Sequence, residues 1–258
     1  MTVHFIGAGP GAADLLTLRA VRLLQESPIC LYAGTYIDDE VLSHCGPETE
    51  LIDTAYLNLD AITATLVAAH DAGHDVARLC SGDPSIYSAI AEQTRRLDAA
   101  GVPWDLTPGV PAYAATAALI GRELTVPEVA QSVVLTRAQK DSTKMPPGET
   151  LAAFAATNAT LVLHLAIRHT RRLADELSAH YGANCPVVVG SQVTQPEELI
   201  LRGTLADIAD QVEAAGLTQA AVIIVGWALS AEGFVESHLY SSRPPRPAGE
   251  GRPDASLV

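Results

Sequence analysis

Short apolar runs alternate with segments of helical periodicity through the first half of the chain. Such an alternation is typical of parallel strands joined by covering helices. The expected strands are Val3–Ile6, Ile29–Tyr32, Leu51–Ile52, Asp75–Cys80 and Trp104–Thr107, and the expected helices are Leu18–Gln25, Leu59–Asp71, Ser85–Ala99 and Ala112–Ile120. The pattern therefore predicts an α/β domain with a parallel sheet over residues 1–121.

A second set of strand and helix patterns follows residues 122–131, which lack periodicity, contain Pro127 and are expected to form a linker. The expected strands are Ser132–Leu135, Thr160–Leu165, Pro186–Gly190, Leu199–Arg202 and Ala220–Val225, and the expected helices are Leu151–Ala156, Thr170–Tyr181 and Leu205–Ala214. We expect a second α/β domain over residues 132–240, with a long polar loop at Thr136–Gly148. Residues 241–258 are rich in proline and glycine and are expected to be a disordered tail.

Composition and charge narrow the range of partners. The chain of 258 residues can form two domains, and its 30 acidic and 16 basic residues give a net charge of −14, which argues against nucleic acid or an anionic membrane as a partner. No run approaches the ~20 apolar residues of a membrane span, and no basic leader is visible, so we expect a cytoplasmic protein. The four cysteines lack C-x-x-C spacing, which predicts buried free thiols and no metal site.

A glycine-rich turn, Gly7-Ala8-Gly9-Pro10-Gly11, follows the first expected strand. A dinucleotide-binding turn would read G-x-G-x-x-G and open directly into a helix, whereas here Pro10 interrupts and the helix is expected only near Thr17. The second strand also ends in Tyr32-Ala33-Gly34 without the acid that would hold a ribose. One glycine could serve a tight turn, but three alternating glycines at a strand end favour a ligand-bordering loop.

The fourth strand leads into Ser81-Gly82-Asp83-Pro84. Asp83 and Pro84 suit the N-cap and first position of a helix, which would explain them without any function. Their place at the carboxyl end of a parallel strand, however, is the usual place for a ligand in α/β sheets. Because the glycine-rich turn should lie at the same edge, the two loops predict a crevice.

Together these motifs resemble the class III, tetrapyrrole-type methyltransferases. The resemblance spans about residues 3–240 and is carried by Gly7–Gly11 with Asp14-Leu15, Leu31–Gly34, Ser81–Tyr87, Thr107–Val110, Leu161–Leu165 and Gly226–Leu229. It implies a parallel-sheet amino-terminal domain, a mixed-sheet carboxy-terminal domain, and an interdomain cleft that binds S-adenosylmethionine and releases S-adenosylhomocysteine. It also implies a homodimer.

The resemblance assigns residues to each ligand. It implies cofactor contacts from Pro10, Ser81, Gly82, Asp83, Ile86, Pro111, Ala112, Leu165, Val193 and Ala228. For a tetrapyrrole substrate it implies Gly9, Gly11, Tyr113, Arg137, Lys140 and Lys144. The last three are also a local basic patch of the kind that an octacarboxylate would need in this acidic chain, although a solvated loop would show the same charges.

Within the family, a further group of segments resembles the members that methylate C11 of precorrin-4 in corrin synthesis. These segments are Tyr32–Tyr36, Leu57–Asp60, Ala91–Gln93, Leu135–Ala138 and Met145-Pro146. Thr35 and Tyr36 depart from an expected Ser-Leu pair, and His164 stands where a larger apolar or aromatic residue is common. We expect His164 to be a core histidine whose polar atoms are satisfied.

The chemistry of carbon methylation requires little from titratable residues. An enamine-like carbon of a reduced tetrapyrrole is already nucleophilic, so an apolar wall that excludes water and fixes the methyl group could supply much of the rate. Ile86, Leu165, Val193 and Ala228 are candidates for that wall. No catalytic residue is nominated, because packing explains Tyr113 and helix capping explains Asp83 at least as well as proton transfer.

Several alternatives stay open at this point. Within the class they are another regiochemistry on uroporphyrinogen-III or another precorrin, cobalt-precorrin-4 as substrate, or the diphthine-synthase branch. From other classes they are a Rossmann-type oxidoreductase and a non-catalytic tetrapyrrole carrier.

Overall fold

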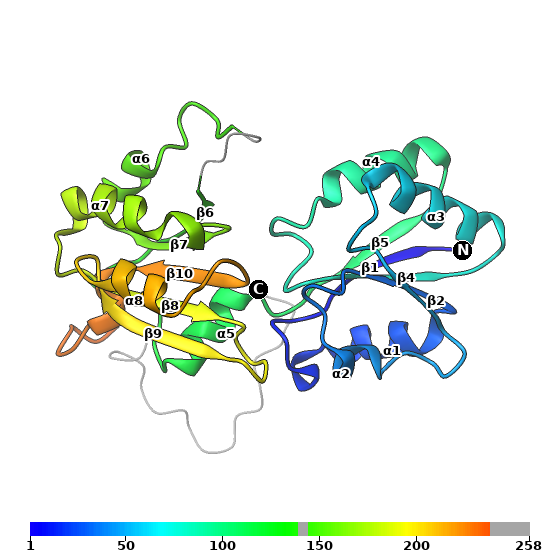
Figure 1. Cartoon of the computed structure of the whole chain (residues 1–258), viewed down its shortest axis with the longest axis horizontal. Helices are drawn as coiled ribbons and strands as arrows, with labels where there is room; N and C mark the ends of the chain where they lie inside the picture. Colours follow the sequence, from blue (N-terminus) through cyan, green and yellow to red (C-terminus); the bar gives the residue numbers. More distant parts are fainter. Residues whose placement is uncertain (139–143, 238–258) are drawn as a thin grey trace, which may run out of the picture.

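The computed structural model describes residues 1–138 and 144–237, which form two lobes built on separate five-stranded sheets (Figure 1). The expected tail at 241–258 lies outside the described residues. The chain order of strands and longer helices agrees with the sequence pattern in both halves. The predicted α/β class, with a parallel sheet first and a mixed sheet second, is therefore confirmed.

The first sheet has the order β3-β2-β4-β1-β5, and all its pairings are parallel. Its strands are β1 (Val3–Gly7), β2 (Ile29–Tyr32), β3 (Glu50–Asp53), β4 (Val76–Cys80) and β5 (Trp104–Thr107). Its helices are η1 (Ala13–Leu15), α1 (Leu18–Glu26), α2 (Asp39–Leu42), α3 (Leu59–Asp71) and α4 (Ile90–Ala100). Alternate side chains face opposite sides, so α1 and α2 cover one face and α3 and α4 the other (Figure 1).

The start of α4 differs from the prediction. A helix was expected from Ser85, with Asp83 as N-cap and Pro84 in first position, but α4 begins at Ile90. Tyr87 and Ala89 have φ values of +56° and +52°, a left-handed conformation that no α-helix can contain. Asp83 is therefore not a helix cap in this fold, and its carboxylate is used in another way.

The second sheet has the order β6-β7-β10-β8-β9, with β6 and β7 parallel and the other pairs antiparallel. Its strands are β6 (Val133–Arg137), β7 (Thr160–His164), β8 (Pro186–Ser191), β9 (Leu199–Thr204) and β10 (Ala221–Val225). The helices of this half are α6 (Leu151–Ala155), η2 (Ile167–His169), α7 (Thr170–Tyr181), α8 (Ile208–Ala214) and η3 (Trp227–Ser230). Helix α8 starts later than expected because the amides of Leu205 and Ala206 bond to the carbonyls of Cys185 and Ala183.

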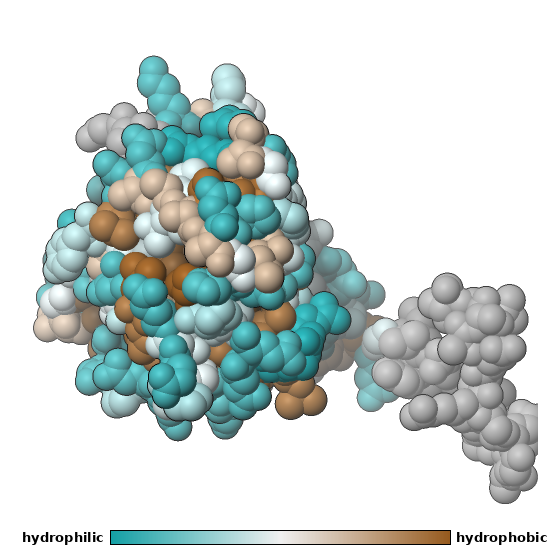
Figure 2. All heavy atoms as spheres, turned by 90° about the vertical axis from the view of Figure 1, so that its right-hand side faces the viewer, coloured by the Kyte–Doolittle hydropathy of each residue, from teal (hydrophilic) through white to brown (hydrophobic). Residues whose placement is uncertain are grey.

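Helix α5 (Ala112–Leu119) links the two lobes and packs on the second sheet. Tyr113, Ala117 and Ile120 lie against a core cluster that includes Val162 and Val222, on the face opposite to α7 and α8. The boundaries of 1–121 and 132–240 remain predictions. The outer end of the first lobe is mostly hydrophilic, with apolar side chains scattered among polar ones (Figure 2).

Candidate functional site

Three loops of the first lobe meet at the carboxyl ends of β4, β1 and β5. Gly7, Gly82 and Gly109 come so close that a Cβ on Gly7 would lie 2.4 Å from the Gly109 nitrogen, and a Cβ on Gly109 would lie 2.2 Å from the Gly82 oxygen. Gly9 and Gly82 also exchange backbone hydrogen bonds. The expectation that the two turns share one edge of the sheet is confirmed, and the first reason for these glycines is backbone packing.

The second lobe holds the glycine-rich turn from the other side. The amide of Ala12 donates to Thr194 Oγ1 at 3.0 Å, and Gln195 Nε2 donates to the carbonyl of Pro10 at 3.3 Å. A Cβ on Gly11 would lie 2.3 Å from Cγ of Gln195, so a side chain at this position would require Gln195 to move. The turn of the first lobe and the β8–β9 loop of the second thus form one wall.

A cavity of about 640 Å³ lies between the lobes and takes its lining from both. Its size is typical of sites for small ligands. Of the predicted cofactor residues, the lining includes Pro10, Ser81, Ile86, Ala112, Leu165 and Val193. Residues from the two halves that the sequence assigned to one ligand therefore border one space.

The other predicted cofactor residues differ in how close they lie to the cavity. Gly82 is packed beside Pro111 and next to the cavity-lining Ser81. Ala228 is buried with Val126 and Ala130 and is not among the residues that line the cavity.

Asp83 serves the backbone of the neighbouring loops. Its carboxylate accepts hydrogen bonds from the amides of Ser85 and Gly109 at 2.8 and 2.9 Å, and from the Ser85 hydroxyl. Burial acts to raise the pKa of Asp83, but these hydrogen bonds outweigh it and hold the pKa below the usual range. Asp83 is thus an ionised brace between the β4 and β5 loops and a poor proton acceptor.

The predicted substrate residues fall into two groups. Tyr113 on α5 and Arg137 at the end of β6 lie near His164, with Arg137 beside it in the strand register and the Tyr113 ring edge-on to it at 6.4 Å. Gly9 and Gly11 lie in the glycine-rich turn. Lys144 is exposed, and Lys140 lies outside the described residues.

His164 is not the satisfied core histidine that was expected. Its Nε2 atom is buried without a hydrogen-bond partner, and the residue lines the cavity. The Tyr87 ring lies 5.4 Å away, and burial lowers the pKa of His164, so the neutral ring is favoured. Leaving such an atom unpaired costs about 1–3 kcal/mol, which a ligand in the cavity could recover.

Backbone strain gathers around the same cavity. Among the lining residues, Tyr87, Ala89, Leu165 and Gln192 have φ values between +44° and +56° although none is glycine. Thr194, which binds the Ala12 amide, has a φ of +65°. Strained non-glycine residues persist where the surroundings fix them, and they cluster at ligand sites.

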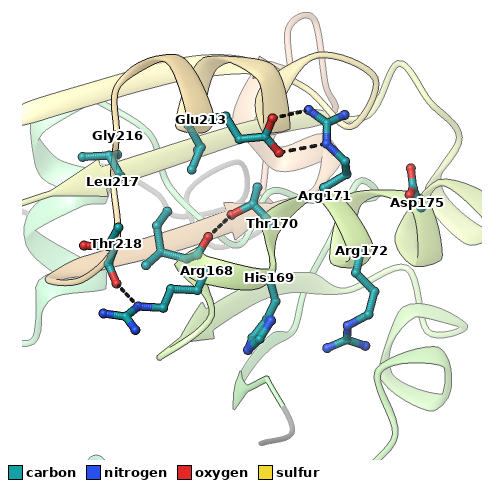
Figure 3. A pocket seen from close by; sticks show the side chains of 12 residues that line it. Arg168, His169, Thr170, Arg171, Arg172, Asp175, Glu213, Gly216, Leu217 and Thr218 are labelled. Carbon is teal, nitrogen blue, oxygen red and sulfur yellow. Dashed lines mark hydrogen bonds and ion pairs between the residues drawn. The ribbon is translucent and has the colours of Figure 1, made fainter.

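A second hollow of about 790 Å³ borders the cavity and shares Ile167, Arg168 and Thr218 with it. Figure 3 shows that its basic side chains come from η2 and the start of α7. Arg171 pairs with Asp210 and Glu213, and Arg172 pairs with Glu176. Much of its positive charge is thus already compensated, and the interdomain cavity is the better candidate site.

Comparison with known proteins identifies the family. A family model described as tetrapyrrole (corrin/porphyrin) methylases matches residues 2–209. This chain belongs to that family. It is an S-adenosylmethionine-dependent C-methyltransferase, which removes the Rossmann-type oxidoreductase from the alternatives.

Individual relatives agree with this assignment. The chain is 56% identical over 242 residues, 94% of this chain and 97% of the relative, to a precorrin-4 C(11)-methyltransferase of Rhodococcus erythropolis. A solved cobalt precorrin-4 methyltransferase matches with a TM-score of 0.85 at 35% identity, covering 88% of this chain and 95% of that one. A uroporphyrin-III C-methyltransferase of Thermus thermophilus, solved with S-adenosylhomocysteine, has a TM-score of 0.74 at 27% identity, covering 89% and 93%.

The cavity also contains residues that the sequence analysis did not assign to a ligand. Arg78, Tyr36, Tyr87 and Gln192 all line it. Arg78 was hidden inside an apolar strand pattern, although an arginine in such a run is itself a signal, because charged residues are almost never fully buried without a partner. Within the described residues, no cluster could hold a metal ion, and no helix is long and apolar enough to cross a membrane.

Proposed function

We propose that this chain transfers the methyl group of S-adenosylmethionine to C11 of precorrin-4 and so produces precorrin-5 in cobalamin biosynthesis. The observation that carries the proposal is the interdomain cavity, to which both lobes contribute strained backbone and predicted ligand residues. The 56% identical relative named for this reaction supports the regiochemistry. The cobalt-free substrate is favoured over the cobalt form because the cobalt-specific structure is only 35% identical.

We further propose that the cofactor is bound by Pro10, Ser81, Gly82, Asp83, Ile86, Pro111, Ala112, Leu165, Val193 and Ala228. The residues fit such a group, because the cavity offers apolar side chains beside backbone polar groups and the unpartnered His164 Nε2. When bound, S-adenosylmethionine supplies an activated methyl group on a sulfonium. Ile86, Leu165 and Val193 exclude water from the reacting atoms, and the braced β4 loop limits their movement.

We propose that the tetrapyrrole is bound by Gly9, Gly11, Tyr113, Arg137 and Lys144, which are not among the residues that line the cavity, and by Lys140, which lies outside the described residues. Arg137 and Tyr113 flank His164, so a macrocycle placed against these rings would bring a carboxylate toward Arg137. No residue is assigned as a general base, since the Asp83 carboxylate is already committed to backbone amides.

Product analysis tests the reaction. The purified chain is incubated with labelled S-adenosylmethionine and, in separate reactions, with precorrin-4, cobalt-precorrin-4 and uroporphyrinogen-III. We expect one methyl group on precorrin-4, with carbon NMR assigning it to C11. Transfer to another position, or preference for another precursor, would replace the proposal with the corresponding regiochemistry, and no transfer to precorrin-4 would refute it.

Arg137→Ala tests the substrate side. We expect the KM for precorrin-4 to rise about tenfold, the effect of losing one charge-assisted contact, while the KM for S-adenosylmethionine changes less than twofold. Arg22→Ala, which removes an exposed arginine paired with Glu26 and not assigned to any ligand, is the comparison variant and should change neither KM. Equal effects of Arg137→Ala on both KM values would argue against a substrate role.

We also infer from the family resemblance that the chain forms a homodimer, which light scattering on the purified protein tests through the molar mass. The cytoplasmic location likewise stays a prediction from the sequence.

A further inference from the structure

Arg78 on β4 is a buried cation without an anionic partner. The residue is 8% exposed, and no carboxylate of the described residues lies within ion-pair distance of it. By contrast, the half-buried Arg96 pairs with Asp60, and the exposed Arg171 pairs with two carboxylates. Among the arginines that the structure describes, Arg78 is the buried one, and no described carboxylate serves as its counter-ion.

The hydrogen bonds of Arg78 are long and lead to neutral groups. Its Nε donates to Gln93 Oε1 at 3.3 Å, and its Nη1 donates to Thr54 Oγ1 at 3.3 Å and to the carbonyl of Leu79 at 3.4 Å. These partners hold the side chain in place without neutralising it. Cys80 does not neutralise it either, because burial raises the pKa of that thiol to about 11.

The remaining nitrogen of Arg78, Nη2, is unpaired among the described residues and not completely buried. Nη2 has no hydrogen bond to the described residues. If Nη2 were also fully buried, it would be an unsatisfied buried atom, but within the described residues His164 Nε2 is the only such side-chain atom. Nη2 is therefore accessible, and the open space beside Arg78 is the interdomain cavity, which Arg78 lines together with Tyr36 and Tyr87. A fixed guanidinium edge at the wall of a cavity suits a planar anion.

We propose that Arg78 binds a carboxylate of a ligand in the interdomain cavity. The inference rests on the proposed function, which brings two carboxylate sources into this space: the acidic side chains of the tetrapyrrole and the amino-acid end of S-adenosylmethionine. Burial lowers the pKa of Arg78 with no carboxylate to offset it, so a bound carboxylate would recover electrostatic energy that the folded chain leaves unused.

The test compares Arg78→Met and Arg78→Lys with the wild type. Calorimetry measures binding of S-adenosylhomocysteine and of 5′-methylthioadenosine, which lacks the amino-acid end, and turnover gives the KM for precorrin-4. If the tetrapyrrole supplies the carboxylate, Arg78→Met raises that KM about 30-fold and leaves both nucleoside affinities unchanged. If the cofactor supplies it, Arg78→Met weakens S-adenosylhomocysteine about 30-fold but leaves 5′-methylthioadenosine unchanged. Arg78→Lys keeps the charge and should restore part of the loss.

Two controls separate a ligand role from a structural one. Arg96→Met removes a half-buried arginine that is paired with Asp60 and should leave every affinity unchanged. The melting temperature of unliganded Arg78→Met should stay near the wild-type value, since the variant removes an unpaired buried charge. A large fall in melting temperature with unchanged affinities, or equal weakening of both nucleosides, would overturn the proposal.

The outcome does not depend on turnover. If the wild type does not methylate precorrin-4, the proposed function fails, while the calorimetry and quenching of the fluorescence of uroporphyrin, a stable octacarboxylate, still test Arg78. Wild-type turnover with unaffected Arg78→Met binding would sink the Arg78 proposal alone.

Discussion

In the first lobe, the loops that reach the cavity are fixed by backbone packing, whereas in the second lobe they carry strain and an unsatisfied ring nitrogen. Gly7 and Gly109 leave no room for a side chain, and Asp83 ties the β4 loop to the β5 loop. Leu165 and Gln192, in contrast, hold left-handed conformations without being glycine. The loops of the first lobe stabilise the fold, whereas those of the second lobe lower its stability.

This contrast predicts the sign of substitution effects. Changes on the first side should cost stability directly, whereas changes on the second side should gain stability and lose function, as is common where a site is strained. The contrast between the lobes has an exception, because Tyr87 and Ala89 belong to the first lobe and also have positive φ values.

Gly109→Ala should have the largest effect. The new Cβ would lie 2.2 Å from the Gly82 oxygen and 2.8 Å from Gly7 Cα, and backbone atoms cannot rotate away. We expect a loss of about 3–4 kcal/mol in the free energy of unfolding in urea, or failure to fold. Gly148→Ala, where a Cβ meets nothing within 4 Å, is the matched control and should stay within about 0.5 kcal/mol of wild type. Equal stability of the two variants would contradict the packing argument.

Asp83→Asn should cost about 2 kcal/mol at neutral pH, because charge-assisted hydrogen bonds to Ser85 and Gly109 are lost. The folded pKa of Asp83 is depressed, so its contribution is complete above the unfolded value of 3.8 and is lost as the pH falls through the lower folded value. Urea unfolding at several pH values should show the two proteins converging in acid. Asp53→Asn removes a similar but exposed acceptor of two backbone amides and should cost less. A difference that grew in acid would refute the assignment.

The same contrast explains what could be predicted from the sequence. Glycine and proline mark the loops of the first lobe, so the Gly7–Gly11 turn and the Ser81–Pro84 turn could be found and brought to one edge of the sheet. The strained positions of the second lobe carry Leu165, Gln192 and Thr194, whose side chains give no sign of a positive φ. Their conformation is imposed by tertiary contacts, which a local pattern does not contain.

The sequence also did not predict the environment of single polar residues inside apolar runs. The apolar run around His164 predicts a core histidine with satisfied polar atoms, and the run around Arg78 predicts a strand. Neither run predicts hydrogen-bond partners, because periodicity reports burial alone. The start of α4 was misplaced for a related reason. Asp83-Pro84 fits a helix cap locally, but the carboxylate is taken by Gly109, 26 residues further along the chain.

His164→Phe tests the unsatisfied side of the comparison. Replacing the ring removes the unpartnered Nε2, so we expect a gain of about 1 kcal/mol in stability, measured in urea, together with a fall of about tenfold in kcat/KM for precorrin-4. His164→Gln keeps a polar group in the cavity and should show neither the gain nor the full loss. A loss of stability in His164→Phe would contradict the assignment of His164 Nε2 as an unsatisfied polar atom.

Leu165→Gly should have the smallest effect and is the sharpest test of strain. Leu165 has a φ of +52° and is 54% exposed, so glycine relieves the backbone while giving up little packing. We expect a gain of about 0.5 kcal/mol, because the relief of 1–2 kcal/mol is partly offset by the greater freedom of glycine in the unfolded chain. Glu128→Gly, at a φ of +61° and outside the cavity lining, should gain the same amount in urea unfolding. Methyl transfer should fall only in Leu165→Gly, which removes part of the apolar wall. If Leu165→Gly lost stability while Glu128→Gly gained it, the conformation at Leu165 would be stabilised by its side chain. The cavity loops of the second lobe would then be stabilising, as those of the first lobe are.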